Sequence, residues 1–182
     1  MSLISAMNPT APITTEAEAQ AAARSSAIAI IIGVIYGVVG IIVTYATMGT
    51  IKAAAAAAAA AQGTPGGPDA ALVANVAVQS ALWMGIGFTV IQAILAFVQW
   101  RRPNKVIAII FLALIALGIV STLASVAMMS SGALPANAAA TPIWQVVLGI
   151  VVMLVEAVLH FAGLRGIGKL DKIQMDAANS AY

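Results

Sequence analysis

Four uninterrupted apolar runs dominate this chain, and each is long enough to cross a lipid bilayer as a helix. They cover approximately residues 25–48, 72–100, 106–129 and 143–164. A helix needs about 20 residues, at a rise of 1.5 Å each, to cross the hydrocarbon layer of a membrane. Buried helices of soluble proteins seldom run this long without a charge. The runs therefore predict an all-α integral membrane protein, whose four transmembrane helices form an antiparallel bundle.

The small number of charged side chains supports this class. Charged residues make up 8% of the chain and hydrophobic ones 62%, whereas soluble domains carry about 25% charged residues. The net charge of +2 does not indicate nucleic-acid binding, because the basic residues lie beside the apolar runs. The expected partners are the lipid bilayer and either other membrane-protein subunits or further copies of this chain. With no cysteine, disulfides, thiolate catalysis and cysteine-ligated metals are excluded.

The distribution of Lys and Arg between the short loops predicts the orientation in the membrane. Lysine and arginine are enriched in cytoplasmic loops, so both termini are expected in the cytoplasm. Together with the alanine-rich composition, this favours the inner membrane of a bacterium, with an organelle membrane as the alternative. Only Lys52 falls on the other side of the expected bundle, while seven basic residues share the terminal side: Arg24, Arg101, Arg102, Lys105, Arg165, Lys169 and Lys172.

The transmembrane helices are expected near residues 25–61, 69–100, 105–130 and 142–166, within a domain that spans 25–166. The alanine run 53–61 favours a first helix that continues beyond the membrane, until the Gly- and Pro-rich residues 63–68 break it. The loop at 130–141 carries no charge, and Pro142 suits the first turn of the last helix.

Two cytoplasmic tails are expected to flank this domain. Residues 1–24 form either a solvated extension or a tail that becomes helical near Thr15, because Thr15 and Glu18 have the spacing of a capping box. The glycine-rich residues 163–168 are expected to end the fourth helix, which leaves residues 167–182 as the C-terminal tail.

Small residues on the helix faces predict where the helices pack. Gly33 and Gly37 form a GxxxG pair, which lets another helix backbone approach closely. Packing within the chain is the expected use, and dimerisation is the alternative. The glycines expected at helix contacts are Gly33, Gly37, Gly40, Gly85, Gly118 and Gly149. The residues expected at the membrane surfaces, where aromatic and basic side chains are favoured, are Trp100, Arg101, Arg102, Lys105, Trp144 and Arg165.

Glu156 is the only charged residue inside an apolar run, and the only histidine, His160, follows it by four residues. A charge at bilayer depth costs several kcal/mol and is rarely present without a partner or a function. Glu156 and Gln92 lie eight or nine residues from the basic ends of their helices, about 12–14 Å deep. Tyr36 reaches a similar depth if its helix is tilted. The sequence thus predicts an intramembrane polar cluster of Glu156, His160, Gln92 and Tyr36.

Four interpretations of this cluster are open. In the first it is structural, with Glu156 protonated or hydrogen-bonded to His160 or Gln92. In the second it is a proton or ion pathway, where intramembrane Glu and His residues recur. A metal or haem site is the third, although Glu156 and His160 supply only two ligands. The fourth is hydrolysis by Ser121 or Ser125 with His160, for which the nucleophile elbow is missing.

The scarcity of reactive side chains favours a protein that is not an enzyme and carries no cofactor or metal. The leading hypothesis is a small polytopic accessory or scaffold subunit that acts through helix–helix packing. The alternative is an oligomeric transporter or proton/ion pathway centred on Glu156 and His160. A cofactor-binding electron-transfer subunit is a third possibility.

Overall fold

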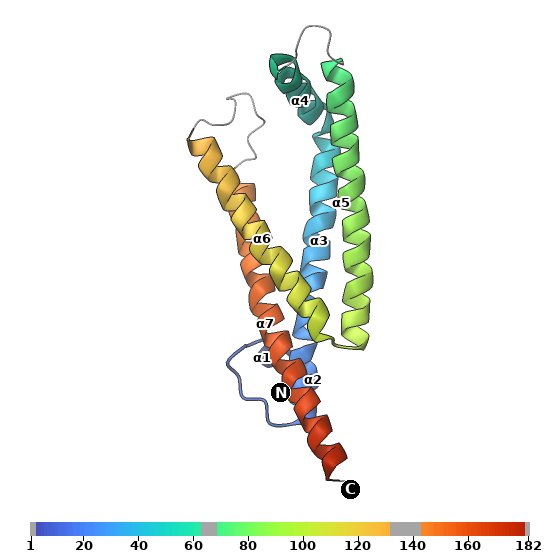
Figure 1. The fold of residues 1–182 in the computed structure, drawn as a ribbon, viewed down its shortest axis with the longest axis vertical. Helices are drawn as coiled ribbons and strands as arrows, with labels where there is room; N and C mark the ends of the chain where they lie inside the picture. The colour runs from blue at the N-terminus through green and yellow to red at the C-terminus, as the bar shows by residue number, and fades with distance from the viewer. Residues whose placement is uncertain (1–2, 63–68, 132–142, 181–182) are drawn as a thin grey trace.

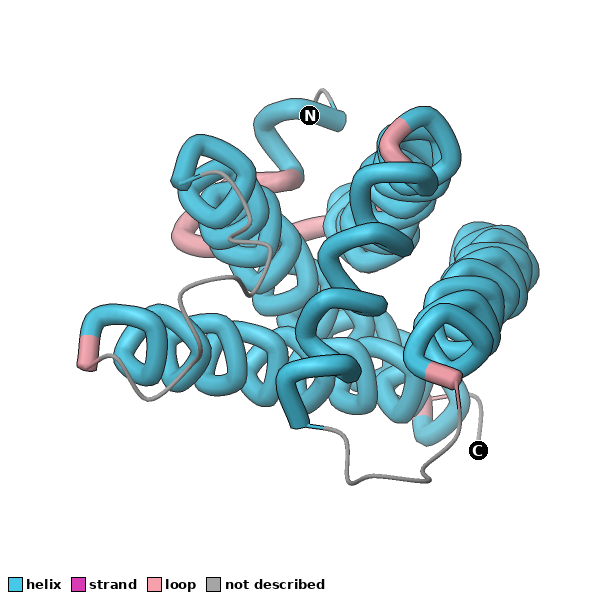
Figure 2. The backbone as a smooth tube through the Cα atoms, turned by 90° about the horizontal axis from the view of Figure 1, so that it is seen from above, coloured by secondary structure: helices cyan, strands magenta, loops and turns pink. Residues whose placement is uncertain are grey.

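The computed structural model describes residues 3–62, 69–131 and 143–180 (Figure 1). All regular structure in these ranges is helical, and none of it is strand (Figure 2). Four of the described helices are long and apolar enough to cross a membrane. The predicted all-α class with four membrane-length helices is therefore confirmed. The predicted helix break at 63–68, most of the loop at 130–141 and Pro142 lie outside the described residues.

Two short helices, α1 (Leu3–Ala6) and α2 (Glu16–Ala23), precede the four long ones. The long helices are α3 (Ser25–Ala46), α5 (Ala70–Arg101), α6 (Lys105–Ser130) and α7 (Ile143–Asn179), with α4 (Met48–Gln62) continuing α3. Helix α3 packs against α5 and α7, and α7 also packs against α2 and α6. The α3/α5 and α6/α7 pairs lie close together near both chain termini and diverge toward the other end (Figure 1).

The first long helix is not continuous to residue 61, as the sequence predicted, but is interrupted at Thr47. The Thr47 hydroxyl donates a hydrogen bond to the Val43 carbonyl at 2.8 Å. The Thr47 amide also donates to the Val43 carbonyl, at 2.9 Å, so the interruption is a local departure from helical dihedral angles at Thr47, where φ is −102° and ψ is 9°. The alanine run then forms α4, which packs against α5.

Thr15 and Glu18 form a capping box at the start of α2. The Glu18 amide donates to the Thr15 hydroxyl at 3.3 Å, and the Thr15 amide donates to the Glu18 carboxylate at 3.1 Å. The N-terminal tail is therefore helical from near Thr15 and is not a plain solvated extension. One face of the N-terminal segment is buried against Leu170 and Ile173 of α7; its buried residues are Ala6, Ile13, Ala19 and Ala22.

The glycine-rich residues 163–168 do not end the last helix, contrary to prediction. Helix α7 passes through them and continues to Asn179. Gly163 and Gly166 are buried because the α2–α3 junction lies directly on them. A Cβ on Gly163 would lie 2.5 Å from Ser26 Cβ, and one on Gly166 would lie 2.6 Å from the Ala22 carbonyl carbon. Here glycine allows helices to touch, and this packing offsets its low helix propensity, about 1 kcal/mol relative to alanine.

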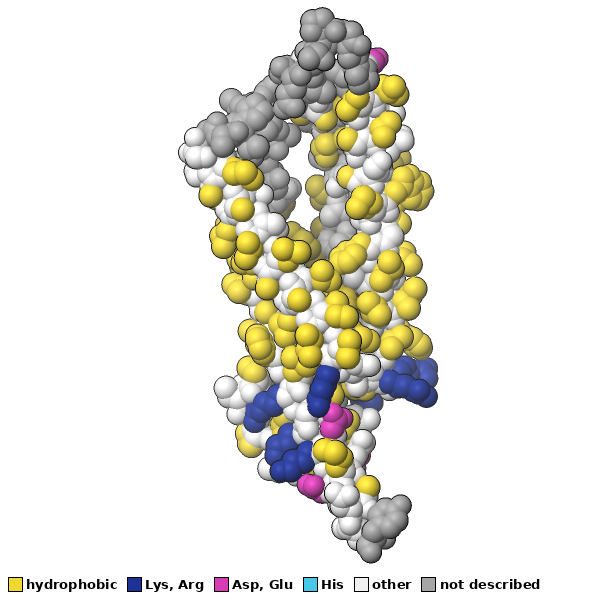
Figure 3. Space-filling view, viewed as in Figure 1, with side chains coloured by type: hydrophobic (Ala, Val, Ile, Leu, Met, Phe, Trp, Pro, Cys, Tyr) yellow, Lys and Arg dark blue, Asp and Glu magenta, His cyan; other side chains and the backbone are white. Residues whose placement is uncertain are grey.

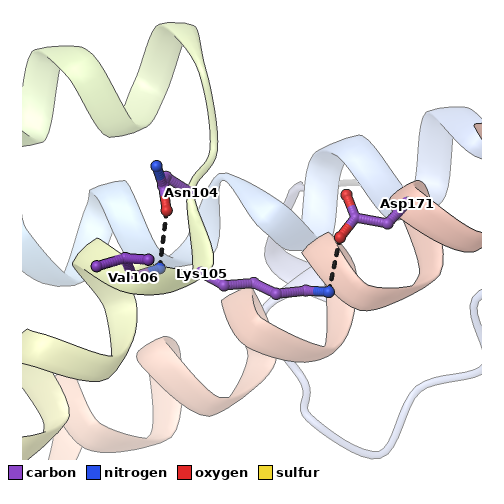
Figure 4. A network of polar contacts seen from close by, with 4 residues as sticks. All are labelled: Asn104, Lys105, Val106 and Asp171. Atoms are coloured by element: carbon purple, nitrogen blue, oxygen red, sulfur yellow. Dashed lines mark hydrogen bonds and ion pairs between the residues drawn. The ribbon is translucent and has the colours of Figure 1, made fainter.

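A side-chain brace holds the short turn between α5 and α6. The buried Gln99 side chain donates to the Asn104 carbonyl at 3.2 Å and accepts from the Asn104 amide at 3.0 Å. Asn104 in turn accepts from the Val106 amide, and the Lys105 ammonium reaches Asp171 of α7 at 2.6 Å (Figure 4). The exposed ion pair contributes about 0–1 kcal/mol, so the buried Gln99 is the main restraint on this turn.

Substitution of Gly166 tests the contact between α7 and α2. Gly166→Leu should lower the unfolding free energy by roughly 1–3 kcal/mol or more, because the new side chain meets backbone that cannot move aside cheaply. Gly168→Leu is the matched control, since nothing lies within 4 Å of a Cβ at that position. Thermal unfolding of the detergent-solubilised variants, followed by circular dichroism, measures the difference. Equal melting temperatures would contradict the packing described here.

Candidate functional site in the membrane cleft

A cleft of about 370 Å³ lies between α3, α5 and α7. The space-filling view shows the opening between the two helix pairs, toward the end remote from the basic residues (Figure 3). Glycines and hydroxyl-bearing residues line much of it, and Glu156 and Gln92 contribute the carboxylate and the amide. The wall residues from α3 and α5 that have small or polar side chains are Gly33, Tyr36, Gly37, Gly40, Thr44, Ala81, Gly85, Thr89 and Gln92.

Glu156 and Gln92 both lie close to Gly33. A Cβ on Gly33 would lie 3.0 Å from the Glu156 Oε1 atom and 3.7 Å from the Gln92 Nε2 atom. The missing side chain of Gly33 therefore makes room for both polar groups. No hydrogen bond or ion pair joins Glu156 to any residue that the structure describes. The carboxylate borders the cleft without a partner of its own.

Tyr36 separates this cleft from a second cavity. Its hydroxyl lies 3.0 Å from the position of a Cβ on Gly149. Tyr36 and Met153 border both cavities, and the second one, about 420 Å³, extends toward Thr122 and Gln145 of α6 and α7. Polar side chains are thus present on both sides of Tyr36.

His160 does not join this cluster. Its side chain is fully buried, its Nδ1 atom lies 2.8 Å from the Ser26 hydroxyl, and its ring stacks on Phe111 with centroids 5.5 Å apart. The expected pair with Glu156 is not formed, because Ser26 and Phe111 enclose the ring one turn further along α7. Its Nε2 atom is buried with no partner among the described residues. The predicted cluster is therefore two separate sites, one open and one closed.

The six predicted packing glycines divide into two groups. Four meet a neighbouring side chain at the distance of a tight contact: Gly33 and Gly37 of α3, Gly118 of α6 and Gly149 of α7. The closest is Gly37, where a Cβ would lie 2.8 Å from the Thr89 hydroxyl. Gly40 and Gly85 instead face the cleft, with nothing within 4 Å.

Five of the six predicted interface residues lie at the basic end of the molecule, and Trp144 lies at the opposite end of α7. At the basic end, the Arg24 guanidinium stacks over Trp100 at 5.5 Å, and the Arg101 guanidinium stacks over Phe97 at 5.1 Å. Arg165 donates to the Pro9 carbonyl. The sequence did not indicate the roles of Arg24, Ser26 or Phe111, because each depends on a residue distant in the chain.

Neither the metal-site nor the hydrolase interpretation gains support from the described geometry. Among the described residues, no three His, Asp or Glu side chains gather where they would hold a metal ion. Ser121 and Ser125 donate to carbonyls of their own helix, at 3.0 and 2.8 Å, and not to His160. Ser26 does contact His160, but both side chains are fully buried, so a substrate has no access to them.

The fold and the cleft are those of a multi-pass membrane protein with a polar site between its helices. The chain matches no protein-family model, no curated protein and no solved structure. Its function is therefore argued from its own side chains.

Substitution of Ser26 tests the closed site. Ser26→Ala should lower the unfolding free energy by about 1–3 kcal/mol, because it leaves the buried Nδ1 atom of His160 without a partner. Adding His160→Phe should recover part of this loss, since both polar groups are then gone. Thermal unfolding in detergent measures both effects, with Ser121→Ala as the control on an exposed serine. A Ser26→Ala variant as stable as the unchanged chain would rule out the pairing.

Proposed function

We propose that this chain is a non-enzymatic membrane protein that serves as an accessory or scaffold subunit, and that its cleft receives a transmembrane helix of a partner subunit. The observation that carries the proposal is Glu156, a carboxylate that borders an open, glycine-walled cleft and has no partner among the described residues. A group of this kind at membrane depth is rarely left facing lipid.

The chemistry of Glu156 indicates what the partner helix carries. The four apolar runs of this chain contain no lysine or arginine, so a second copy of the chain offers no cation at that depth. A different subunit with a lysine or arginine on the face of its helix would pair with the carboxylate and provide hydrogen-bond donors. Charge complementarity therefore favours a partner of different sequence over a homo-oligomer.

The walls of the cleft suit one face of a helix, because about 370 Å³ has room for a few inserted side chains. Gly40 and Gly85 face open space within it. Helices associate in membranes through close backbone contact, which small residues permit. The larger aliphatic side chains lie on the outer faces, where the bilayer solvates them; examples are Ile42, Ile94 and Leu117, which are 58–65% exposed.

We infer that the basic end of the molecule is cytoplasmic. The support is the excess of lysine and arginine at the end where both termini lie. Because the chain lacks cysteine, a Ser180→Cys variant carries a single label site. A membrane-impermeant maleimide should label it in inside-out vesicles and not in intact cells or spheroplasts. Labelling of intact cells would reverse the orientation.

Filling the cleft tests the scaffold role. Gly85→Leu should release the partner subunit from the complex isolated in mild detergent from the native membrane, because the side chain occupies space that the partner helix needs. Gly87→Leu is the matched control: it lies on the same helix, also has nothing within 4 Å, and does not line the cleft. Mass and stoichiometry of the purified complexes, measured by native mass spectrometry, report the loss.

Two results would contradict the scaffold proposal. One is a chain that leaves its native membrane as a monomer. The other is a complex that survives Gly85→Leu and Gly87→Leu equally well.

A proton or ion pathway centred on Glu156 is the second candidate, favoured by the polar cavities on both sides of Tyr36. Four helices leave little room for alternating access, so this function requires an oligomer. Glu156→Gln separates the two candidates. Loss of assembly supports the scaffold role, whereas intact assembly with loss of flux in reconstituted vesicles supports the pathway. An electron-transfer subunit would require the purified protein to absorb visible light or contain stoichiometric metal.

A further inference from the structure

An apolar groove of about 310 Å³ lies between α3 and α5, at the basic end of the molecule. Unlike the cleft, it is lined almost entirely by hydrocarbon, and its large side chains are exposed on the outer surface: Ile35 is 59% and Phe97 61% exposed. From Ala93 to Trp100 the groove extends about 10 Å along α5. It therefore faces the bilayer, from the membrane surface inward.

Two guanidinium groups are held at this groove by its own aromatic residues. Arg24 stacks over Trp100, and Arg101 stacks over Phe97. Both rings line the groove, and cation–π contacts of this kind hold a guanidinium at the face of a ring. Neither arginine forms an ion pair with a described carboxylate; the ion pair at this end is Lys105–Asp171. Two uncompensated positive charges thus stand beside an apolar groove.

We propose that the groove binds an anionic phospholipid, with an acyl chain along Ile31, Ile35 and Ala93 and the phosphate between Arg24 and Arg101. The guanidinium fork matches the oxygens of a phosphate. The depth of Trp100 matches the membrane interface, where tryptophan is favoured. A zwitterionic lipid carries its own cation and competes poorly for a site with two positive charges. The groove and the charges together specify this occupant.

This site does not depend on the proposed scaffold function. The groove lies between α3 and α5 and shares no lining residue with the cleft that contains Glu156. Failure of one proposal therefore leaves the other standing.

The charges are tested on the full-length purified chain. Native mass spectrometry after exchange into micelles containing phosphatidylglycerol or phosphatidylcholine measures lipid retention. The unchanged chain should retain phosphatidylglycerol preferentially, and Arg24→Gln with Arg101→Gln should weaken that retention roughly tenfold or more. Lys169→Gln with Lys172→Gln is the control, because it removes the same charge from exposed positions on α7 at the same end. If the Arg24→Gln, Arg101→Gln double variant fails to fold, Arg101→Gln alone replaces it in the experiment, because Arg101 is exposed.

The groove is tested by Ala93→Phe, which fills it while leaving both arginines in place. Retention of phosphatidylglycerol should fall severalfold, and inorganic phosphate should not displace the lipid. Ala113→Phe is the control: it is exposed, on α6, and eight residues from the basic end of its helix, as Ala93 is. The proposal is overturned by equal retention of the two lipids, by an equal loss in the Lys169 and Lys172 variant, or by an Ala93→Phe chain that binds normally.

Discussion

The backbone contact between α7 and the α2–α3 junction determines how the rest of the molecule is arranged. At Gly163 and Gly166 no side chain separates the helices, so α7 lies directly on Ser26 and Ala22. The N-terminal segment packs on the extension of α7 beyond that point. From this contact at one end, the α3/α5 and α6/α7 pairs diverge toward the other end (Figure 1). The cleft is a consequence of this one-sided packing.

The same arrangement explains why two polar residues of one helix differ in environment. His160 lies less than one turn from Gly163, where the helices are closest, and is enclosed by Ser26 and Phe111. Glu156 lies one turn further from the contact, where Gly33 and the opening cleft leave space around it. Distance from the close contact, and not residue type, decides which group is sealed. His160 is therefore enclosed by the described helices, whereas Glu156 borders the open cleft.

Much of the fold could be predicted from the sequence because the bilayer permits few alternatives. A long apolar run in lipid must satisfy its backbone internally, so the four helices follow from run length alone. The capping box of Thr15 and Glu18 is equally local, and the structure contains it. The continuation of α7 through residues 163–168 was not predicted, because glycine can either end a helix or let another helix pack closely. Which of the two occurs depends on the packed segment, here the α2–α3 junction. The break at Thr47 was missed because threonine is a common helix residue in membranes.

The candidate site was harder to predict, since helical phase gives a direction but not a neighbour. The residue spacing places Glu156 and His160 on one face of α7. One turn apart on that face, however, Glu156 borders the cleft and His160 packs against Phe111. At the groove between α3 and α5, Arg24 stacks over Trp100, a residue that is distant in the sequence. No local pattern encodes such a pairing, because it arises from the packing of α3 against α5.

The polar groups within the long helices differ in whether they can be satisfied inside one chain. Hydroxyls donate to carbonyls of their own helix: Thr89 to Gly85, Thr122 to Gly118 and Ser125 to Ser121, each at 2.8 Å. An ionised carboxylate has no proton to donate and can only accept, while the backbone amides inside a helix are already used. While ionised, Glu156 would therefore need a donor from another element, and the described helices do not supply one. The carboxyl group thus differs from the hydroxyls of the neighbouring helices, which are satisfied within their own helix.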